Sequence, residues 1–448
     1  MKKVLTITLC FVLLLSAASF ATKTRVKTMG DNNEILLDEA NIWLFPSRLF
    51  DYPDVAIADF NSSDGYVFPD KDAEVYSGND FYFHEFGVHW KFGKDKPFVL
   101  GTYLYNSVGQ YYDEAYLGAQ YWPVGLGMLI NQFGGSIFNS SEWGVPDDDL
   151  SNKRISLFYS RELGGHKFGF AFHKLHSSER DEDDEGNTTF DESFSRYNFS
   201  LGLTEASGMW DVAAHVQMIT WKDKGYGVPP GGSEATELDQ TKPAGNMTFT
   251  VLGRYFKQMN PVITLVPHAS FVYGKFESED YFVGGYVEDP NTNKLNTLAF
   301  TVGGGMHYQP SAGMLAVIDF GLSYAKADFE FVNAQGTEDV TDETNTTILT
   351  LPYAKMGFEG EVFDWMQVRF GATTYWRDIT EEDIEDGETD DKDFTRFPDN
   401  MTYLGLEFNW NRLTIDAWAN PEMFLDGFNF ISGSTNEMNA GLSAIYSF

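Results

Sequence analysis

The chain has almost no cysteine, and after its first residues it has no long apolar run. Among its 448 residues there is one cysteine, Cys10, which lies in an apolar stretch near the N-terminus. The rest of the chain has no cysteine, so a mature form without that stretch can form no disulfide, no thiolate metal site and no cysteine nucleophile. No later stretch approaches the ~18 apolar residues of a membrane helix, so a membrane-embedded form of this chain must be a closed β-barrel.

Basic residues are also scarce. The chain carries 31 Lys and Arg against 66 Asp and Glu, a net charge of −35, which excludes nucleic acid as a partner. Two of the lysines, Lys2 and Lys3, precede an apolar run from Val4 to Leu15 and the small-residue pattern Ser19-Phe20-Ala21. This pattern predicts a secretory signal peptide over residues 1–21, cleaved after Ala21; the alternative is an uncleaved anchor helix. Cleavage would leave 29 basic residues and a net charge of −37.

From Phe81 onward, apolar and polar residues alternate with a period of two. In "TLAFTVGGGMHYQ", Leu298, Phe300 and Val302 share one face, and Thr297 and Thr301 the other. The same alternation recurs in residues 247–255, 366–376 and 404–410. It indicates strands whose apolar face meets lipid and whose polar face lines a wet lumen. A soluble β-sandwich is the alternative, but its outer face should be richer in Lys and Glu and its strands shorter.

Short and long connections alternate along the chain, as periplasmic turns and external loops do in outer-membrane barrels. The long ones are acidic and include residues 177–192, 223–245 and 378–398. The sequence therefore predicts an all-β protein, a transmembrane antiparallel up-and-down β-barrel of about 16 strands, with 14 and 18 as neighbouring counts. Residues 22–80 would hold the first strand, at Glu39–Leu49, and an optional plug. Residues 81–448 would form the barrel, within which Tyr116–Gly135 is either a hairpin or a lumenal segment.

The C-terminus "NAGLSAIYSF" resembles that of Gram-negative outer-membrane β-barrels of the porin class. Tyr446 and Phe448 match the hydrophobic and terminal aromatic residues of the family's assembly signal, whereas Ser443 stands where many members have glycine. The resemblance implies recognition by the barrel-assembly machinery and residence in the bacterial outer membrane.

The N-terminal region, with Met29-Gly30, Asp38-Glu39-Ala40 and Pro46, more loosely resembles long-chain fatty-acid transporter-like barrels. Phe45-Pro46-Ser47 stands where those relatives have Asn-Pro-Ala. This second resemblance implies a plug in the lumen and a hydrophobic substrate.

Charged and histidine side chains on the polar face of the strands are the candidate pore-lining residues, because rings of charged groups set the ion preference of a pore. They are Glu85, His89, Arg254, His268, His307, Asp319, Arg369, Glu407 and Asp416. We therefore predict an outer-membrane channel for passive or facilitated diffusion of small solutes, favouring cations because the chain is acidic. The alternatives are a plugged transporter for hydrophobic substrates and a structural or adhesive barrel with acidic surface loops.

One acidic stretch matches the spacing of an EF-hand loop. Asp181, Asp183, Glu185 and Glu192 occupy positions 1, 3, 5 and 12, a candidate Ca²⁺ site, although the flanks look like strands and a solvated acidic loop is the simpler interpretation. No other cofactor is expected. No nucleophile elbow is present, so an enzyme is not predicted. The expected partners are outer-membrane lipid and lipopolysaccharide, the assembly machinery and small solutes; a homo-oligomer is left open.

Overall fold

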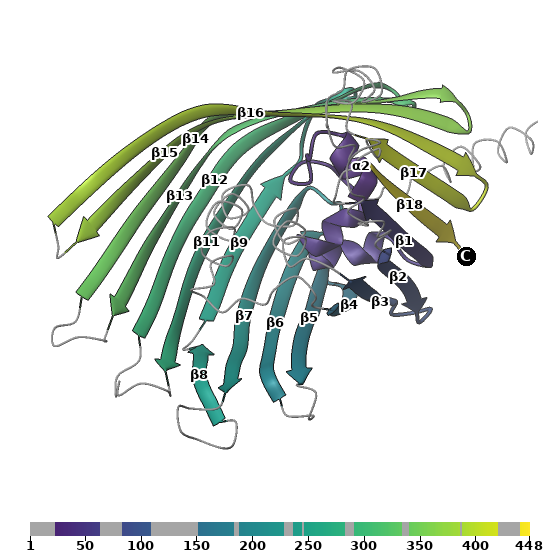
Figure 1. Cartoon of the computed structure of the whole chain (residues 1–448). Helices are drawn as coiled ribbons and strands as arrows, with labels where there is room; N and C mark the ends of the chain where they lie inside the picture. The colour runs from purple at the N-terminus through teal and green to yellow at the C-terminus, as the bar shows by residue number, and fades with distance from the viewer. Residues whose placement is uncertain are drawn as a thin grey trace, which may run out of the picture.

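The computed structural model describes residues 23–62, 83–108, 151–182, 188–227, 236–243, 246–282, 291–333, 340–385, 388–419 and 440–448. In these ranges the chain forms one large antiparallel sheet and three short helices (Figure 1). The helices are α2 (Lys23–Thr28) and the 3₁₀ helices η1 (Glu39–Trp43) and η2 (Pro46–Asp51). The strands are β1 (Val55–Ser62), β2 (Phe83–Phe92), β3 (Phe98–Val108), β4 (Ser151–Leu163), β5 (His166–Glu182), β6 (Thr188–Glu205), β7 (Trp210–Gly227), β8 (Thr236–Pro243), β9 (Asn246–Tyr255), β10 (Lys257–Asn260), β11 (Ile263–Phe282), β12 (Asn291–Ser311), β13 (Met314–Asn333), β14 (Val340–Phe363), β15 (Met366–Glu385), β16 (Glu388–Trp410), β17 (Leu413–Ala419) and β18 (Ala440–Ser447).

The sheet closes on itself. Strand β1 pairs antiparallel with β18 on one side, from Val55↔Ser447 to Ser62↔Ala440, and with β2 on the other. Segments β8, β9 and β10 are successive pieces of one strand, because all three pair with β11. The 18 segments therefore make 16 strands, and the predicted closed, all-β, up-and-down barrel is confirmed.

The predicted division into two faces is also confirmed. Phe300, Phe370 and Trp410 are among the large apolar side chains exposed on the outer surface, whereas Thr301 and Arg369 are buried on the inside. Because a closed barrel satisfies its backbone within the sheet, this outer apolar surface can face lipid. Among the described residues, no helix is long and apolar enough to cross a membrane.

The first strand was predicted at the wrong place. Glu39–Leu49 does not enter the sheet but forms most of η1 and η2, and the first strand begins at Val55. Local hydrogen bonds explain the difference, since the Asp38 side chain accepts from the Ala40 N–H and the Asn41 side chain accepts from the Asp38 N–H. This capping box, with Pro46 in the first turn of η2, favours helical turns over an extended strand.

The predicted long loops were too long. Most of the acidic residues 378–398 belong to β15 and β16, which extend to Glu385 and start again at Glu388. Arg396 donates to Asp378 at 2.5 and 2.6 Å across the two strands, and Lys392 pairs with Glu382 at 3.4 Å. Hydrophilic sequence therefore continues as paired strands, and one end of the barrel extends as long arms (Figure 1).

The EF-hand flanks form a β-hairpin. Asp181 pairs with Phe190 across β5 and β6, and Glu192 pairs with Glu179. Asp183 and Glu185 lie outside the described residues, as does Tyr116–Gly135. The Ca²⁺ site thus stays a prediction, on a backbone that differs from the helix–loop–helix frame of an EF-hand.

Candidate functional site in the barrel lumen

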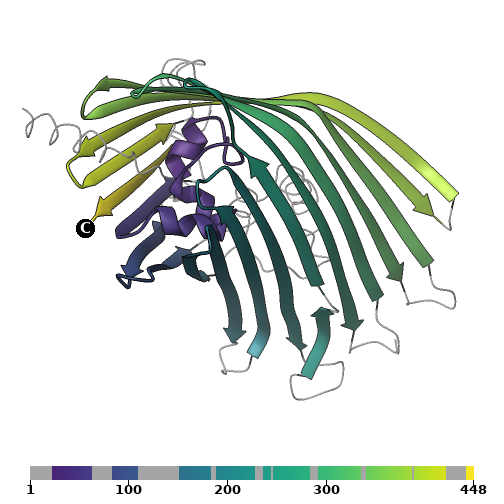
Figure 2. The ribbon, with the colours of Figure 1, turned by 180° about the vertical axis from the view of Figure 1, so that it is seen from behind.

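The N-terminal segment, residues 23–54, lies inside the barrel (Figures 1 and 2). Helix α2 contacts β15 to β18, and η2 contacts β3 to β6, so the segment contacts the wall on both sides of the closure between β18 and β1. Its apolar residues Met29, Ile35, Leu36, Ile42 and Leu49 are fully buried. The wall surrounds most of the segment's apolar side chains, and Leu37 is an exposed exception.

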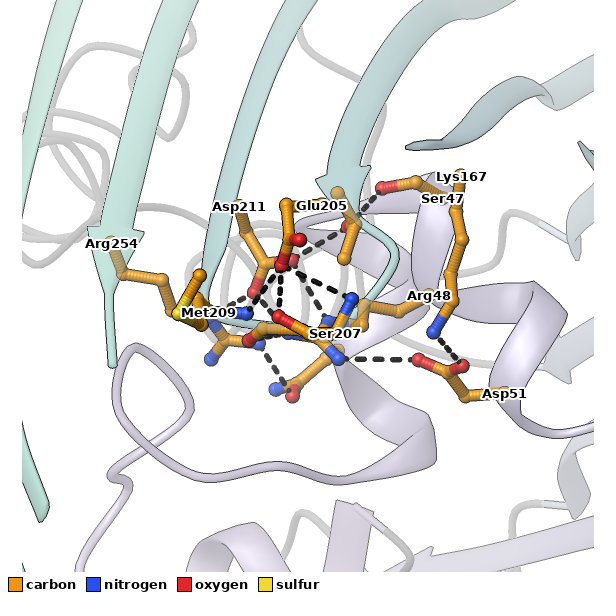
Figure 3. Close-up of polar contacts among 12 residues, drawn as sticks. Ser47, Arg48, Asp51, Lys167, Glu205, Ser207, Met209, Asp211 and Arg254 are labelled. Carbon is orange, nitrogen blue, oxygen red and sulfur yellow. Dashed lines mark hydrogen bonds and ion pairs between the residues drawn. The ribbon is translucent and has the colours of Figure 1, made fainter. Parts of the chain in front are cut away.

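Three carboxylates of the wall hold the segment, and each does so in the same way. Asp211 on β7 accepts from Arg48 of the segment, through Nε and Nη2 at 2.9 Å each, and from Nε of the wall residue Arg254 at 2.7 Å (Figure 3). Thr204 donates a further hydrogen bond to it at 2.6 Å. The carboxylate is fully buried between one cation of the segment and one of the wall.

The second carboxylate is Glu359 on β14. It accepts from Arg25 of the segment at 2.7 Å and from Arg369 of the wall at 2.5 Å. Arg369 also donates to Asp416 at 2.5 Å and to Glu407, and it is fully buried. This guanidinium on β15 therefore has three carboxylate partners, on β14, β16 and β17.

The third carboxylate is Glu85 on β2. It pairs with Lys23 of the segment and accepts from Arg154 on β4 at 2.7 Å. Each of the three wall carboxylates thus bridges one cation of the segment and one of the wall. If the segment left, each of these three carboxylates would keep its wall partner and would not remain as an unpaired buried charge.

Wall side chains also bind main-chain carbonyls of the segment. Nη1 of Arg254 donates to the carbonyls of Asn33, Glu34 and Leu36 at 2.8–3.2 Å. Three wall histidines contact three more carbonyls at 2.7–3.0 Å, which are His89 with Tyr52, His215 with Leu44 and His307 with Ile35. These contacts provide wall partners for main-chain carbonyls of the irregular segment.

Glycines of the wall let the segment approach closely. A Cβ at Gly357 would lie 2.5 Å from the carbonyl oxygen of Met29. A Cβ at Gly371 would collide with the main-chain nitrogen of Gly30. A Cβ at Gly169 would collide with the main chain of Pro46 and Ser47. Two adjacent strands, β14 and β15, thus present bare backbone where the segment turns at Gly30.

One carboxyl of the segment, that of Glu39, forms no ion pair with the described residues. Glu39 is buried, and its Oε2 atom has no hydrogen-bond partner among the described residues. Burial, and next the charge of Asp38, raises the pKa of Glu39 well above its usual value, with smaller contributions from Asp416 and Asp59. The docked segment therefore favours the protonated form of this carboxyl.

All of the predicted lumenal residues lie on the inner wall, but they contact the segment or one another. Glu85, His89, Arg254, His307 and Arg369 are described above. Glu407 and Asp416 hold Arg369, and His268 forms a pair with Asp319 at 3.0 Å, near the hydroxyl of Tyr353. Of the predicted assembly signal, Tyr446 and Phe448 both point outward.

Sequence reasoning missed the segment's own cations, Lys23, Arg25 and Arg48, and their wall partners Asp211 and Glu359. For Asp211 and Glu359 a signal was available, because both lie on the polar face of the strands, as do the lumenal residues that were predicted. Within the described ranges, no group of three or more His, Cys, Asp or Glu side chains could hold a metal ion.

No family model and no curated protein matches the sequence. Among solved structures, the toluene transporter TodX of Pseudomonas putida is similar with a TM-score of 0.37 and 10% identity, covering 96% of this chain and 98% of that one. The siderophore receptor PirA of Acinetobacter baumannii has a TM-score of 0.33 and 9% identity, over 88% and 81% of the two chains. A ferric enterobactin receptor mutant of Pseudomonas aeruginosa has a TM-score of 0.32 and 8% identity, over 88% and 80%. With scores this low, the fold assignment rests on the strand pairing itself.

Proposed function

We propose that the protein is an outer-membrane transport channel for small solutes whose N-terminal segment gates the lumen. The observation that carries this proposal is the pairing of Asp211, Glu359 and Glu85, each with one cation of the segment and one of the wall. Removing one partner of a buried ion pair normally leaves an uncompensated charge at a cost of about 3–5 kcal/mol. The second cation at each of these three sites avoids that cost for the wall carboxylate when the segment leaves.

Charge supports cations as the favoured solutes. The chain carries 66 acidic against 31 basic residues, and a lumen or mouth of one sign concentrates ions of the other. In asymmetric salt, the reversal potential of the open channel is expected to show cation preference.

A reversible lock tests the gate. The hydroxyls of Ser47 in the segment and Thr204 on β6 are 2.7 Å apart, so Ser47→Cys with Thr204→Cys places two thiols close enough to attempt a disulfide. The only native cysteine is Cys10, which Cys10→Ser removes. In planar bilayers, the oxidised double variant should carry little current, and reduction should restore the level of the Cys10→Ser protein.

Each single-cysteine variant serves as the matched control and should not respond to reductant. Equal current before and after reduction, with the disulfide verified by mass, would show that the segment does not gate. Absence of current and of solute flux in every reduced variant would instead reject the channel itself.

One observation supports a second candidate function, the passage of apolar solutes. Val272, Leu295, Ala299, Ala325 and Ile348 form an apolar cluster on the inner faces of β11 to β14. An apolar patch on the inside of a barrel suits an apolar ligand better than a hydrated ion. Saturable binding of a small aromatic probe that Ile348→Asn abolishes would favour this candidate, and unsaturable partitioning would remove it.

A further inference from the structure

The outer surface of β11, β12 and β13 carries a compact grid of charged side chains. The strand register places outward-facing residues of the three strands side by side in rows, because each antiparallel pair is continuous through this region. From the hairpin end inward, the rows are Glu277–Lys294–Glu330, Lys275–Asn296–Asp328, Tyr273–Leu298–Lys326 and Phe271–Phe300–Tyr324. We call the seven polar residues of the first three rows, other than Tyr273 and Leu298, the charged grid.

The charged grid faces away from the lumen. The residues that alternate with it, such as Val272 and Leu295, are buried inside, whereas the side chains of Lys275, Lys294 and Lys326 are 48%, 34% and 42% exposed. The row beneath it is aromatic, with Phe300 stacked on Tyr324 at 5.4 Å. Aromatic residues mark the interface of a transmembrane barrel, so the grid lies where lipid headgroups begin.

This end of the barrel corresponds to the outer leaflet. At the end of the barrel that carries the grid, β11 joins β12 through residues 283–290 and β13 joins β14 through residues 334–339. At the opposite end, β12 and β13 join across the short turn at residues 312–313. In outer-membrane barrels the short turns are periplasmic and the longer connections are external.

The lysines of the grid are available to a ligand. Each pairs with a neighbouring carboxylate, Lys275 with Glu277 at 3.2 Å, Lys294 with Glu330 at 2.7 Å and Lys326 with Asp328 at 2.5 Å. Exposed pairs of this kind are worth only about 0–1 kcal/mol, so a dianionic ligand can replace the carboxylates at little cost. The released carboxylates are then free to coordinate a divalent cation through oxygen.

We propose that the charged grid docks a phosphorylated glycolipid headgroup of the outer leaflet. The three lysines bind its phosphates, and Glu277, Asp328 and Glu330 share divalent cations with those phosphates. Charge complementarity carries the proposal, because the grid alternates three ammonium groups with three carboxylates at headgroup level, and a phosphate with its divalent cations presents both signs of charge. The acyl chains of the same lipid would cover the aromatic row beneath.

The test uses the purified full-length chain in detergent, with diphosphoryl lipid A as the probe and native mass spectrometry as the readout. The triple variant Lys275→Gln, Lys294→Gln, Lys326→Gln should bind the probe about tenfold or more weakly, since each lysine near an anionic surface contributes about 1 kcal/mol. Lipid A with a single phosphate should bind the unaltered protein more weakly than the diphosphoryl form. The acidic triple variant Glu277→Gln, Asp328→Asn, Glu330→Gln should lose the dependence of binding on added Mg²⁺.

The matched control replaces three exposed lysines near the short-turn end, Lys94, Lys96 and Lys257, by Gln, which makes the same change in net charge. Equal loss of affinity in both lysine triple variants would mean that only overall charge matters and would overturn the proposal. Equal binding of the two forms of lipid A would also overturn it, because phosphate recognition would then be absent. Unchanged Mg²⁺ dependence in the acidic triple variant would overturn the role of the carboxylates.

Discussion

At the scale of single residues, the lumen is held together by buried charges that are shared between segment and wall. Asp211 and Glu85 are almost completely buried, yet each has two cationic partners. Buried ion pairs contribute little net stability, but they penalise any arrangement that leaves one charge alone. Their effect here is to fix the position of the segment, since Arg48 and Lys23 each pair with one of these buried wall carboxylates.

Glu39 makes the docking of the segment depend on pH. Its pKa is raised in the docked state by burial first and then by Asp38, so the docked form binds a proton more tightly than the released form. Its contribution is fully favourable below the usual carboxyl pKa near 4.5 and is lost as pH rises through the raised value. Each unit by which docking raises the pKa of Glu39 corresponds to about 1.4 kcal/mol in the free energy of docking.

We therefore predict that Glu39→Gln strengthens docking at neutral pH and flattens its pH dependence. The measurement is the rate at which protease cleaves residues 23–54 in the folded barrel, from pH 4 upward. Glu162→Gln, an exposed acid near a short turn, is the control and should leave the profile unchanged. A Glu39→Gln profile that parallels the unaltered protein would contradict the assignment.

At the scale of elements, the segment and the wall fit because the wall strands carry glycine where the segment's backbone passes. Gly371 and Gly357 are paired across β14 and β15, and both lie against residues Met29 to Gly30. The turn itself needs glycine, since Gly30 has φ of 77°. In a strand, glycine weakens the sheet, so its presence at these positions is explained by close approach of another backbone.

We predict that Gly371→Ala displaces the segment from the lumen and leaves the strand pairing of the barrel wall intact. The added methyl group would overlap the main chain at Gly30, and overpacking of this kind costs about 1–3 kcal/mol. Gly304→Ala is the matched control, because Gly304 faces outward with nothing within 4 Å of an added Cβ. Conductance and protease cleavage of the segment should rise for Gly371→Ala alone; the same response in both variants would refute the close fit.

At the scale of the whole molecule, closure depends on β1 and β18, which come from opposite ends of the chain. Eight residues of each strand are paired in an unbroken register, and the N–H of Phe448 extends the contact by donating to the carbonyl of Asp54 at 3.1 Å. The ring of Phe448 packs on Trp90 of β2 at 5.8 Å, on the outer surface. The last residue thus lies at the seam where the barrel closes.

Phe448→Ala should lower the fraction of chains that reach the outer membrane as folded barrel, measured by the heat-dependent shift in gel mobility. Loss of one aromatic contact costs about 0.5–1.5 kcal/mol. The substitution also removes the terminal aromatic residue of the proposed assembly signal. Phe363→Ala is the control, since Phe363 is also exposed outside near a short turn and stacks on Trp365 at 5.4 Å. Equal assembly of the two variants would count against a special role for the terminus.

The sequence by itself determined the barrel and the direction of its side chains. A period of two is a local property of the strand backbone, so Phe300, Thr301 and Arg369 could be placed outside or inside without knowing any contact. The count of 16 strands followed from the alternation of connections, although the acidic hairpins showed that hydrophilic composition alone does not end a strand.

Only the tertiary structure decided what fills the lumen. Residues 39–49 have a strand-like pattern, yet their capping hydrogen bonds and the surrounding wall make them helical turns inside the barrel. The partnership of Arg48 with Asp211 joins residues 163 positions apart, and no local pattern encodes such a distance. Periodicity tells which way a side chain points, whereas its partner depends on how the closed sheet and the segment meet in space.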